Sequence, residues 1–148
     1  MATLFLLVGL PGSGKTTLGA QLARELGALV LSADEWMSRI VRDGWDAERR
    51  VSVQDVQLEI ALQVVRGGGD VVLDWGFFHR SERDACRAQA ATLGVTTRTI
   101  YLDAPRDELV RRLAARNANL PPNTFAVDEV HLDACIGWLE PPTADELD

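Results

Sequence analysis

The sequence contains one stretch whose residue types and spacing can bind phosphate: Gly9-Leu10-Pro11-Gly12-Ser13-Gly14-Lys15-Thr16. It fits the pattern G-x-x-x-x-G-K-[S/T] without a mismatch. Glycines at these positions let the backbone adopt positive φ angles and bring its N–H groups close to phosphate oxygens. The N-terminus of a following helix adds unpaired donors and a partial positive charge. We therefore interpret residues 9–16 as a phosphate loop, with a glycine-rich turn as the alternative.

The side chains at the end of this loop have distinct expected tasks. Lys15 is expected to contact the β- and γ-phosphates of a nucleotide as a point charge, and the Thr16 hydroxyl to bind Mg²⁺. Lys15 is the only lysine in the chain, and it stands where a slender ammonium must enter a phosphate cradle. The predicted nucleotide-binding residues are Gly12, Ser13, Gly14, Lys15, Thr16 and Thr17.

Two aspartates follow apolar stretches that are typical of buried strands. Asp74 comes directly after residues 70–73, and Asp34 comes shortly after residues 28–32. An acid at the end of such a strand is a second Mg²⁺ ligand in phosphate-loop enzymes, so the predicted metal ligands are Thr16 and Asp74. Asp34 lies just past the carboxyl end of its strand, where open α/β sheets bind ligands. The alternative for both aspartates is a capping role at a helix or turn.

The elements that must position these residues alternate along the chain. Apolar runs predict strands at 3–8, 28–32, 70–73 and 96–102, and helical spacing predicts helices at 16–26, 35–42, 52–66, 81–93, 106–116 and 128–139. Capping-box-like starts are predicted at Ser52 with Asp55 and at Ser81 with Asp84. The buried face of the third helix is predicted to carry Val56, Ile60 and Val64. Strands that alternate with helices predict a parallel sheet covered on both faces.

Length and composition limit the function classes. A chain of 148 residues is expected to form a single domain, residues 1–148. Its net charge of −7 is the wrong sign for gripping a nucleic-acid backbone. No apolar run approaches the roughly 20 residues of a membrane span, and no signal peptide is recognisable, so we expect a cytoplasmic protein. Cys86 and Cys135 are predicted to be buried free thiols.

The phosphate loop and the order of the elements resemble those of small phosphate-loop (P-loop) kinases. This group includes polynucleotide-kinase-like domains, zeta-toxin-type kinases, chloramphenicol-phosphotransferase-like enzymes and small AAA-family ATPases. The resemblance extends from Leu4 to about Asp145 and is most specific at the phosphate loop. It implies the three-layer α/β P-loop NTPase fold, with a mostly parallel sheet of four to five strands in the order 2-3-1-4. It also implies ATP and Mg²⁺ as cofactors.

The resemblance assigns roles to further residues. Asp34 is similar to the general base that the group directs at the acceptor hydroxyl, which is chemically reasonable for an acid beside the transferred phosphoryl group. Arginines after the fourth strand resemble those of a mobile lid, which maps onto residues 112–124. The catalytic residues expected on this basis are Lys15, Asp34, Arg112 and Arg116. The alternative for the two arginines is a solvated helix face without a specific role.

Aromatic and basic side chains cluster after the second and third strands, on the side where an acceptor would bind. The residues predicted to contact the acceptor are Asp34, Trp36, Arg39, Trp75 and Arg80, and Phe77, Phe78 and His79 lie next to them in the sequence. The alternative is that these aromatic side chains only pack and that His79 is an ordinary surface residue.

The expected function is that of an ATP- and Mg²⁺-dependent kinase that transfers a γ-phosphoryl group to a hydroxyl of a small metabolite, nucleoside-like compound or antibiotic. Two alternatives stay open: an ATP-binding or ATP-hydrolysing regulatory protein without an acceptor, and a 5′-hydroxyl polynucleotide kinase. A regulatory GTPase is excluded because its Asn-Lys-x-Asp motif needs a second lysine. We expect a small-molecule partner, no nucleic acid or membrane, and a monomer or homodimer.

Overall fold

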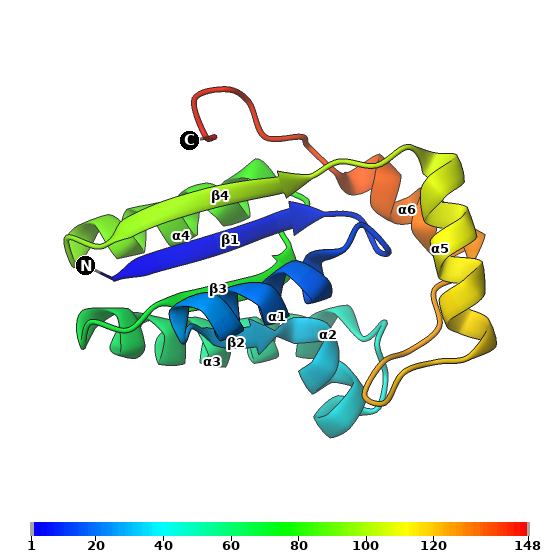
Figure 1. Ribbon diagram of the computed structural model, residues 1–148, viewed down its shortest axis with the longest axis horizontal. Helices are drawn as coiled ribbons and strands as arrows, with labels where there is room; N and C mark the ends of the chain where they lie inside the picture. The colour runs from blue at the N-terminus through cyan, green and yellow to red at the C-terminus, as the bar shows by residue number, and fades with distance from the viewer. Residues whose placement is uncertain (1, 148) are drawn as a thin grey trace.

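A four-stranded parallel sheet forms the centre of the computed structural model, which describes residues 2–147 (Figure 1). Its strands are β1 (Thr3–Gly9), β2 (Leu29–Ser32), β3 (Val71–Gly76) and β4 (Thr96–Leu102). They lie in the order β2-β3-β1-β4, as predicted. Because every neighbouring pair is parallel, all carboxyl ends meet at one edge of the sheet.

Helices cover both faces of the sheet. Helix α1 (Lys15–Leu26) packs on one face, and α3 (Ala47–Arg66) and α4 (Arg80–Thr92) pack on the other, as Figure 1 shows in front of and behind the strands. The central strand β1 serves both layers, since Phe5 and Leu7 face the α1 layer while Leu4 and Leu6 face the other. This double burial explains why the strand appears in the sequence as a continuous apolar run.

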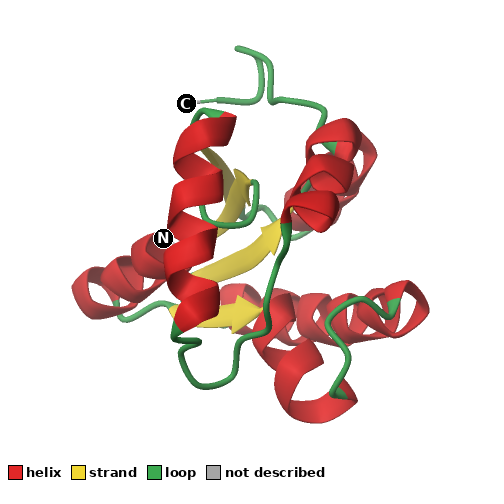
Figure 2. Ribbon diagram, turned by 90° about the vertical axis from the view of Figure 1, so that its right-hand side faces the viewer, coloured by secondary structure: helices red, strands yellow, loops and turns green. Residues whose placement is uncertain are grey.

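The remaining helices lie beyond the carboxyl ends of the strands (Figure 2). They are α2 (Ala33–Trp36), which continues into a π-helical turn (Met37–Val41), α5 (Arg106–Ala118) and α6 (Glu129–Trp138). Leu109 and Leu113 of α5 pack with Val127 and Leu132 in a separate small core, against which Leu10 of the phosphate loop also packs. The lid region is therefore anchored to the loop that it was expected to cover. No helix within residues 2–147 combines the length and apolar character needed to cross a membrane.

The predicted start and buried face of α3 are wrong. The helix begins at Ala47, not at Ser52, because the Asp46 carboxylate accepts the Arg49 N–H at 3.0 Å and caps it earlier. Its buried residues are Val53, Gln57, Ala61 and Val65, whereas Val56 is exposed and Ile60 and Val64 are half-buried. The apolar pattern misled here because a polar residue, Gln57, occupies the buried stripe.

The predicted N-cap of α4, Ser81, is also wrong by two residues. The helix begins at Arg80, and the N-cap is His79, whose backbone N–H donates to the Glu82 carboxylate at 3.3 Å. Glu82 therefore holds the position that the sequence pattern gave to Asp84. The Asp84 carboxylate instead accepts a hydrogen bond from Arg87. The predicted bounds of β4 and the end of α1 at Leu26, with Gly27 at a φ of 68°, are confirmed.

The segment after α6, residues 139–147, turns back along the outer edge of the sheet (Figure 1). We call it the C-terminal strap. Glu146 in this strap forms an ion pair with Arg83 of α4 at 2.7 Å, and both side chains are buried. Leu147 makes a single parallel bridge to Thr99 of β4. The strap thus covers part of the outer edge of β4.

Candidate active site

The phosphate loop connects the end of β1 to the start of α1, in the order that its chemistry requires. Gly12 and Gly14 have φ angles of 84° and 100°, which favour glycine. The Lys15 Nζ donates to the carbonyl oxygens of Gly9 and Leu10 at 2.9 and 3.0 Å, so the ammonium lies curled against the loop. The Ser13 hydroxyl is buried without a hydrogen-bond partner among residues 2–147. These features fit a cradle for phosphate oxygens.

Thr16 and Asp74 are brought together at the end of the loop. The pairing of β1 with β3 places Asp74 beside Leu7, and the Thr16 Oγ1 donates to the Asp74 Oδ2 at 3.2 Å. Burial raises the pKa of Asp74, and the nearby Lys15 opposes that rise. Burial likewise lowers the pKa of Lys15, while Asp74 and Asp34 raise it.

This donor set fits Mg²⁺, which takes hard oxygen ligands and uses one or two protein groups together with phosphate oxygens and water. The Thr16 hydroxyl and the Asp74 carboxylate would hold the ion. The part of the chain that the structure describes contains no group of three or more His, Cys, Asp or Glu side chains placed to hold a metal by themselves.

Asp34 stands in the first turn of α2, directly after β2. The cap of this helix is Ser32, whose Oγ accepts the Glu35 N–H at 3.1 Å, so the capping alternative for Asp34 is wrong. The Asp34 Oδ1 instead lies 2.8 Å from the Arg50 Nη1. The Arg50 Nη2 also donates to the Gly44 carbonyl at 2.9 Å. A guanidinium that is fixed in this way orients the aspartate carboxylate.

The two lid arginines differ in their surroundings. Arg116 is half-buried, its Nη2 donates weakly to the Phe125 carbonyl at 3.4 Å, and its Nε has no partner within the described residues. Burial lowers the pKa of Arg116, and the negative charge of Asp34, which lines the same cavity, opposes that change. Arg112 is exposed and reaches the Gly12 carbonyl at 3.2 Å and Glu108 at 2.9 Å. Arg111 pairs with Glu108 on the outer side of α5.

Helix α5 was predicted to end at Arg116, but it continues through Asn117 to Ala118. The loop between α5 and α6, which is part of the expected lid, therefore begins later than predicted. The Asn117 side chain bonds the Val127 backbone twice: its Nδ2 donates to the carbonyl at 2.8 Å, and its Oδ1 accepts the N–H at 3.2 Å. These two bonds close the loop between α5 and α6. Asn117 therefore stabilises the fold of the lid region by joining the end of α5 to the segment before α6.

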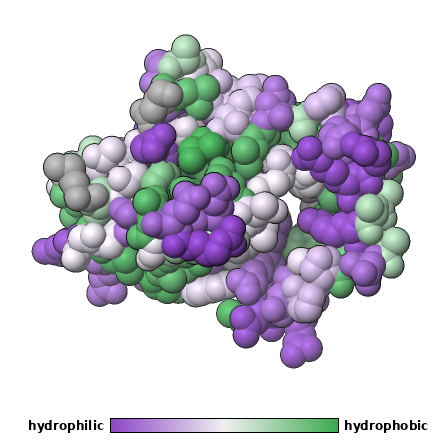
Figure 3. All heavy atoms as spheres, in the orientation of Figure 1, coloured by the Kyte–Doolittle hydropathy of each residue, from purple (hydrophilic) through white to green (hydrophobic). Residues whose placement is uncertain are grey.

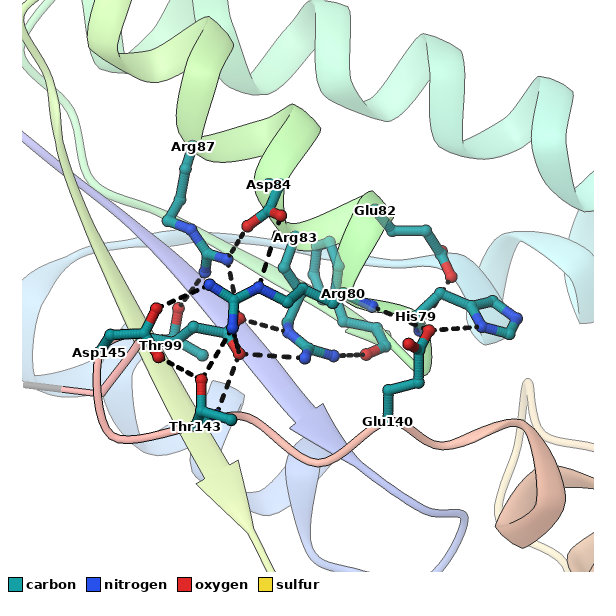
Figure 4. A network of polar contacts seen from close by, with 12 residues as sticks. His79, Arg80, Glu82, Arg83, Asp84, Arg87, Thr99, Glu140, Thr143 and Asp145 are labelled. Atoms are coloured by element: carbon teal, nitrogen blue, oxygen red, sulfur yellow. Dashed lines mark hydrogen bonds and ion pairs between the residues drawn. The ribbon is translucent and has the colours of Figure 1, made fainter.

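A cavity of about 370 Å³ opens next to Lys15 and Asp34. Of the predicted acceptor residues, Asp34 and Trp75 line it, and Trp36, Arg39 and Arg80 do not. Arg39 is exposed and pairs with Glu35 at 3.5 Å. Trp36 packs against the main core. The Arg80 guanidinium donates to Thr143 and Asp145 of the C-terminal strap at 2.8 and 2.7 Å (Figure 4).

A second cavity, of about 260 Å³, lies on the other side of Asp34. Thr16, Asp74 and Arg116 line it, so it contains the metal-ligand pair and a lid arginine. Asp34 and Phe125 belong to both cavities. Figure 3 shows the surface hollowed between the body of the sheet and α5. Asp34 therefore lies between the cavity with the metal-ligand pair and the aromatic cavity, which Lys15 of the phosphate loop also lines.

The structure adds residues that the sequence analysis missed. The newly identified lining residues include Trp45, Arg50, Gln54, Glu82, Phe125, Cys135 and Trp138. Trp45 stacks on His131 of α6 at 3.9 Å between ring centroids and contacts Phe125 edge-on at 5.5 Å. The Asp46 cap was the signal that could have revealed Arg50, because a helix that starts at Ala47 includes it in the first turn.

Gln57 connects the end of β2 to Trp75 of β3 through two hydrogen bonds. Its Oε1 accepts the Trp75 indole N–H at 2.7 Å, and its Nε2 donates to the Ser32 carbonyl at 3.1 Å. Gln57 is completely buried, so both bonds are shielded from water. It therefore fixes the Trp75 ring relative to the end of β2, two residues before Asp34.

Comparisons with known proteins agree with this architecture. A family model described as an AAA domain matches residues 4–142. A shikimate kinase from Paracidovorax citrulli (strain AAC00-1) is 30% identical over 120 residues, which cover 72% of this chain and 59% of the relative. A probable gluconokinase from Schizosaccharomyces pombe (strain 972 / ATCC 24843) is 27% identical over 155 residues, covering 97% of this chain and 76% of the relative.

A crystal structure of a gluconokinase from Sinorhizobium meliloti 1021 has the same fold, with a TM-score of 0.67 and 19% identity over 97% of this chain and 78% of that one. The chain spans only 58–62% of the length of three shikimate kinases that it matches.

Proposed function

We propose that this chain, which belongs to the AAA domain family, is an ATP- and Mg²⁺-dependent kinase. It would transfer the γ-phosphoryl group to a hydroxyl of a small molecule. The observation that carries the proposal is the position of Asp34, which lines both the cavity with the metal-ligand pair and the aromatic cavity. An acid in this position can meet a phosphate donor on one side and an alcohol on the other.

The nucleotide side uses residues of the phosphate loop and β3. The backbone of the loop and Lys15 would bind the β- and γ-phosphates, with Lys15 exchanging its bonds to Gly9 and Leu10 for phosphate oxygens. Thr16 and Asp74 would hold Mg²⁺, which supplies charge neutralisation between the phosphates. Arg116 faces Asp34 across the same cavity, where it can stabilise charge that builds on the transferred group.

The acceptor side requires a base within reach of a hydroxyl. Asp34 would accept the hydroxyl proton as the acceptor oxygen attacks the γ-phosphorus, and the bond to the leaving ADP oxygen breaks. Arg50 holds the Asp34 carboxylate at 2.8 Å and leaves its second oxygen available. Two relatives named as a shikimate kinase and a probable gluconokinase support a small-molecule acceptor.

The test is Mg²⁺-dependent ADP release from ATP, measured with and without pooled acceptors: nucleosides, sugars, aminoglycoside and phenolic antibiotics, and 5′-hydroxyl oligonucleotides. We expect one small-molecule pool to stimulate ADP release and to yield a product heavier by one phosphate. Lys15→Ala should lose most of this transfer, by about 10²-fold or more. Undiminished transfer in Lys15→Ala would contradict the proposal.

A further inference from the structure

We propose that the aromatic cavity of about 370 Å³ binds an uncharged alcohol on an apolar, ring-bearing body and rejects acceptors that carry a carboxylate or phosphate. This inference rests on the proposed function for the transfer step, and it names the substrate class for that step. The cavity has a volume near the lower end of the range for small-molecule sites, about 300–1,000 Å³. It therefore suits an acceptor of one or two rings.

The walls of the cavity offer flat apolar surface. Trp45, Trp75 and Trp138 line it together with Phe78 and Phe125. The Trp75 indole N–H is already satisfied by Gln57, and its ring stacks on Phe77 with 5.1 Å between centroids. Its orientation is therefore fixed before any ligand arrives. Rigid aromatic walls bind a ring by burial and stacking at little entropic cost.

Both cations of the lining are already engaged. Lys15 is bonded to two carbonyls of the phosphate loop and is the residue expected to bind nucleotide phosphates. The Arg50 guanidinium is held by the Asp34 carboxylate at 2.8 Å and by the Gly44 carbonyl at 2.9 Å. A bound carboxylate could recruit Arg50 only by separating it from Asp34.

The other ionisable groups of the lining also disfavour an anion. Glu82 and Asp34 both line the cavity and are acids. The His79 Nδ1 faces Glu140 at 3.2 Å, so even a charged imidazole there would already have an acidic partner. Neighbouring arginines are directed elsewhere: Arg83 is buried against Glu146. Arg80 reaches the C-terminal strap.

This charge arrangement sets the selectivity. An acceptor carboxylate in the cavity would lose water without gaining a free cation and would lie near two acids, which is costly. An amide or hydroxyl at the same place would lose much less on entering. Shikimate and gluconate, after which relatives are named, are both carboxylates and should therefore be poor acceptors for this chain.

The experiment compares matched probes that differ only in charge. The pairs are 4-(hydroxymethyl)benzamide with 4-(hydroxymethyl)benzoate, and the corresponding naphthalene and biphenyl compounds. Their binding to the wild-type chain is measured by calorimetry in the presence of Mg²⁺ and saturating ADP. We expect the amide of at least one pair to bind about tenfold or more tightly than its carboxylate. Equal or tighter binding of the carboxylates, or no binding of any amide, would overturn the inference.

A charge-introducing variant tests the physical cause. Gln54 lines the cavity on α3, whereas Gln63 is an exposed residue of the same helix outside it. Gln54→Arg should reduce the preference for the amide about tenfold, and Gln63→Arg should leave it unchanged. Loss of preference in both variants, or in neither, would refute the electrostatic basis. Titration with ADP separates the two proposals: if ADP and Mg²⁺ bind but no amide does, only the inference fails, and if ADP does not bind, the proposed function fails.

Discussion

Asp34 is the residue on which the proposed chemistry depends most. It does not cap α2, because the N-cap of that helix is Ser32. Its carboxylate is largely exposed, oriented by Arg50, and placed between the two cavities. A base of this kind contributes to the chemical step and not to nucleotide binding.

Replacing this base should therefore separate kcat from nucleotide affinity. Asp34→Asn is expected to lower kcat for acceptor phosphorylation by about 10²- to 10⁴-fold while the Kd for ADP stays nearly constant. The control is Glu48→Gln, because Glu48 is an exposed acid in the first turn of α3 that lines neither cavity. Comparable loss of ADP binding in Asp34→Asn would assign Asp34 to the nucleotide or metal site.

Arg116 and Arg111 offer a matched comparison on one helix. Arg116 is half-buried, lines the same cavity as Asp34, and has an Nε without a partner among residues 2–147, whereas Arg111 is exposed and pairs with Glu108. Arg116→Ala should lower kcat by about 10²- to 10³-fold, since a charge near the transferred group is lost. Steady-state kinetics of Arg111→Ala should match the wild type. If both variants behave alike, α5 acts through packing and not through a lid arginine.

Some site residues were recognisable from sequence and others were not. The phosphate loop and the two aspartates were recognisable because local backbone geometry and strand ends determine their positions. Arg50 and Trp45 were missed because their role depends on how the loop before α3 folds over the end of β2. Arg80 was misplaced because, besides Asp84 in its own helix, its acidic partners Asp145 and Glu146 lie more than sixty residues away in the C-terminal strap.

The C-terminal strap and α4 together hold the residues that follow β3, next to the aromatic cavity. Arg83 donates to both carboxylate oxygens of Glu146 at 2.7 and 3.2 Å, and also to the Phe77 carbonyl at 2.8 Å (Figure 4). Phe78, the next residue, accepts the Glu140 N–H at 2.7 Å and lines the aromatic cavity. The strap thus stabilises the end of β3 from outside.

Breaking the buried pair should be costly. Glu146→Gln leaves the Arg83 charge without its buried partner, so we expect the free energy of unfolding to fall by about 3–5 kcal/mol in urea titrations. The control Asp145→Asn removes an exposed partner of Arg80 from the adjacent position and should cost under about 1 kcal/mol. Similar small effects in both variants would show that the strap is not held by the buried pair.

The same pair predicts a pH dependence. The Arg83 guanidinium lowers the pKa of Glu146 from 4.5 to about 2 in the folded protein. The stabilisation is therefore fully present above the unfolded value and is lost as the pH falls toward the folded value. The difference in unfolding free energy between wild type and Glu146→Gln should narrow between about pH 5 and about pH 3. A difference that stays constant over this range would contradict the assignment.

At the scale of the whole molecule, two halves of the site come from distant parts of the chain. The phosphate loop, α2 and β3 supply Lys15, Asp34 and Asp74, and the α5–α6 region supplies Arg116 and Phe125. The order of the strands in the sheet followed from the resemblance to P-loop kinases. The position of the C-terminal strap could not be predicted, because an acidic tail carries no local sequence signal that one of its glutamates will pair with a buried arginine.

Nucleotide binding should stabilise this assembly through mass action. Mg²⁺ and ADP at about 100 times Kd are expected to raise the unfolding free energy by about 2.7 kcal/mol, and the melting temperature with it. Removing Mg²⁺ with EDTA, or introducing Asp74→Asn, should reduce this shift, since Thr16 and Asp74 are the proposed ligands. A shift that is insensitive to both treatments would place the metal elsewhere.

The stoichiometry of transfer distinguishes a kinase from an ATP-hydrolysing protein. ADP formed and acceptor phosphorylated are quantified together in wild type and Asp34→Asn, with the acceptor pool that best stimulates turnover. The kinase account predicts one phosphorylated acceptor for each ADP, and a parallel fall of both in the variant. ADP accompanied by free phosphate, with no phosphorylated acceptor and no effect of Asp34→Asn, would instead show an ATP-hydrolysing protein.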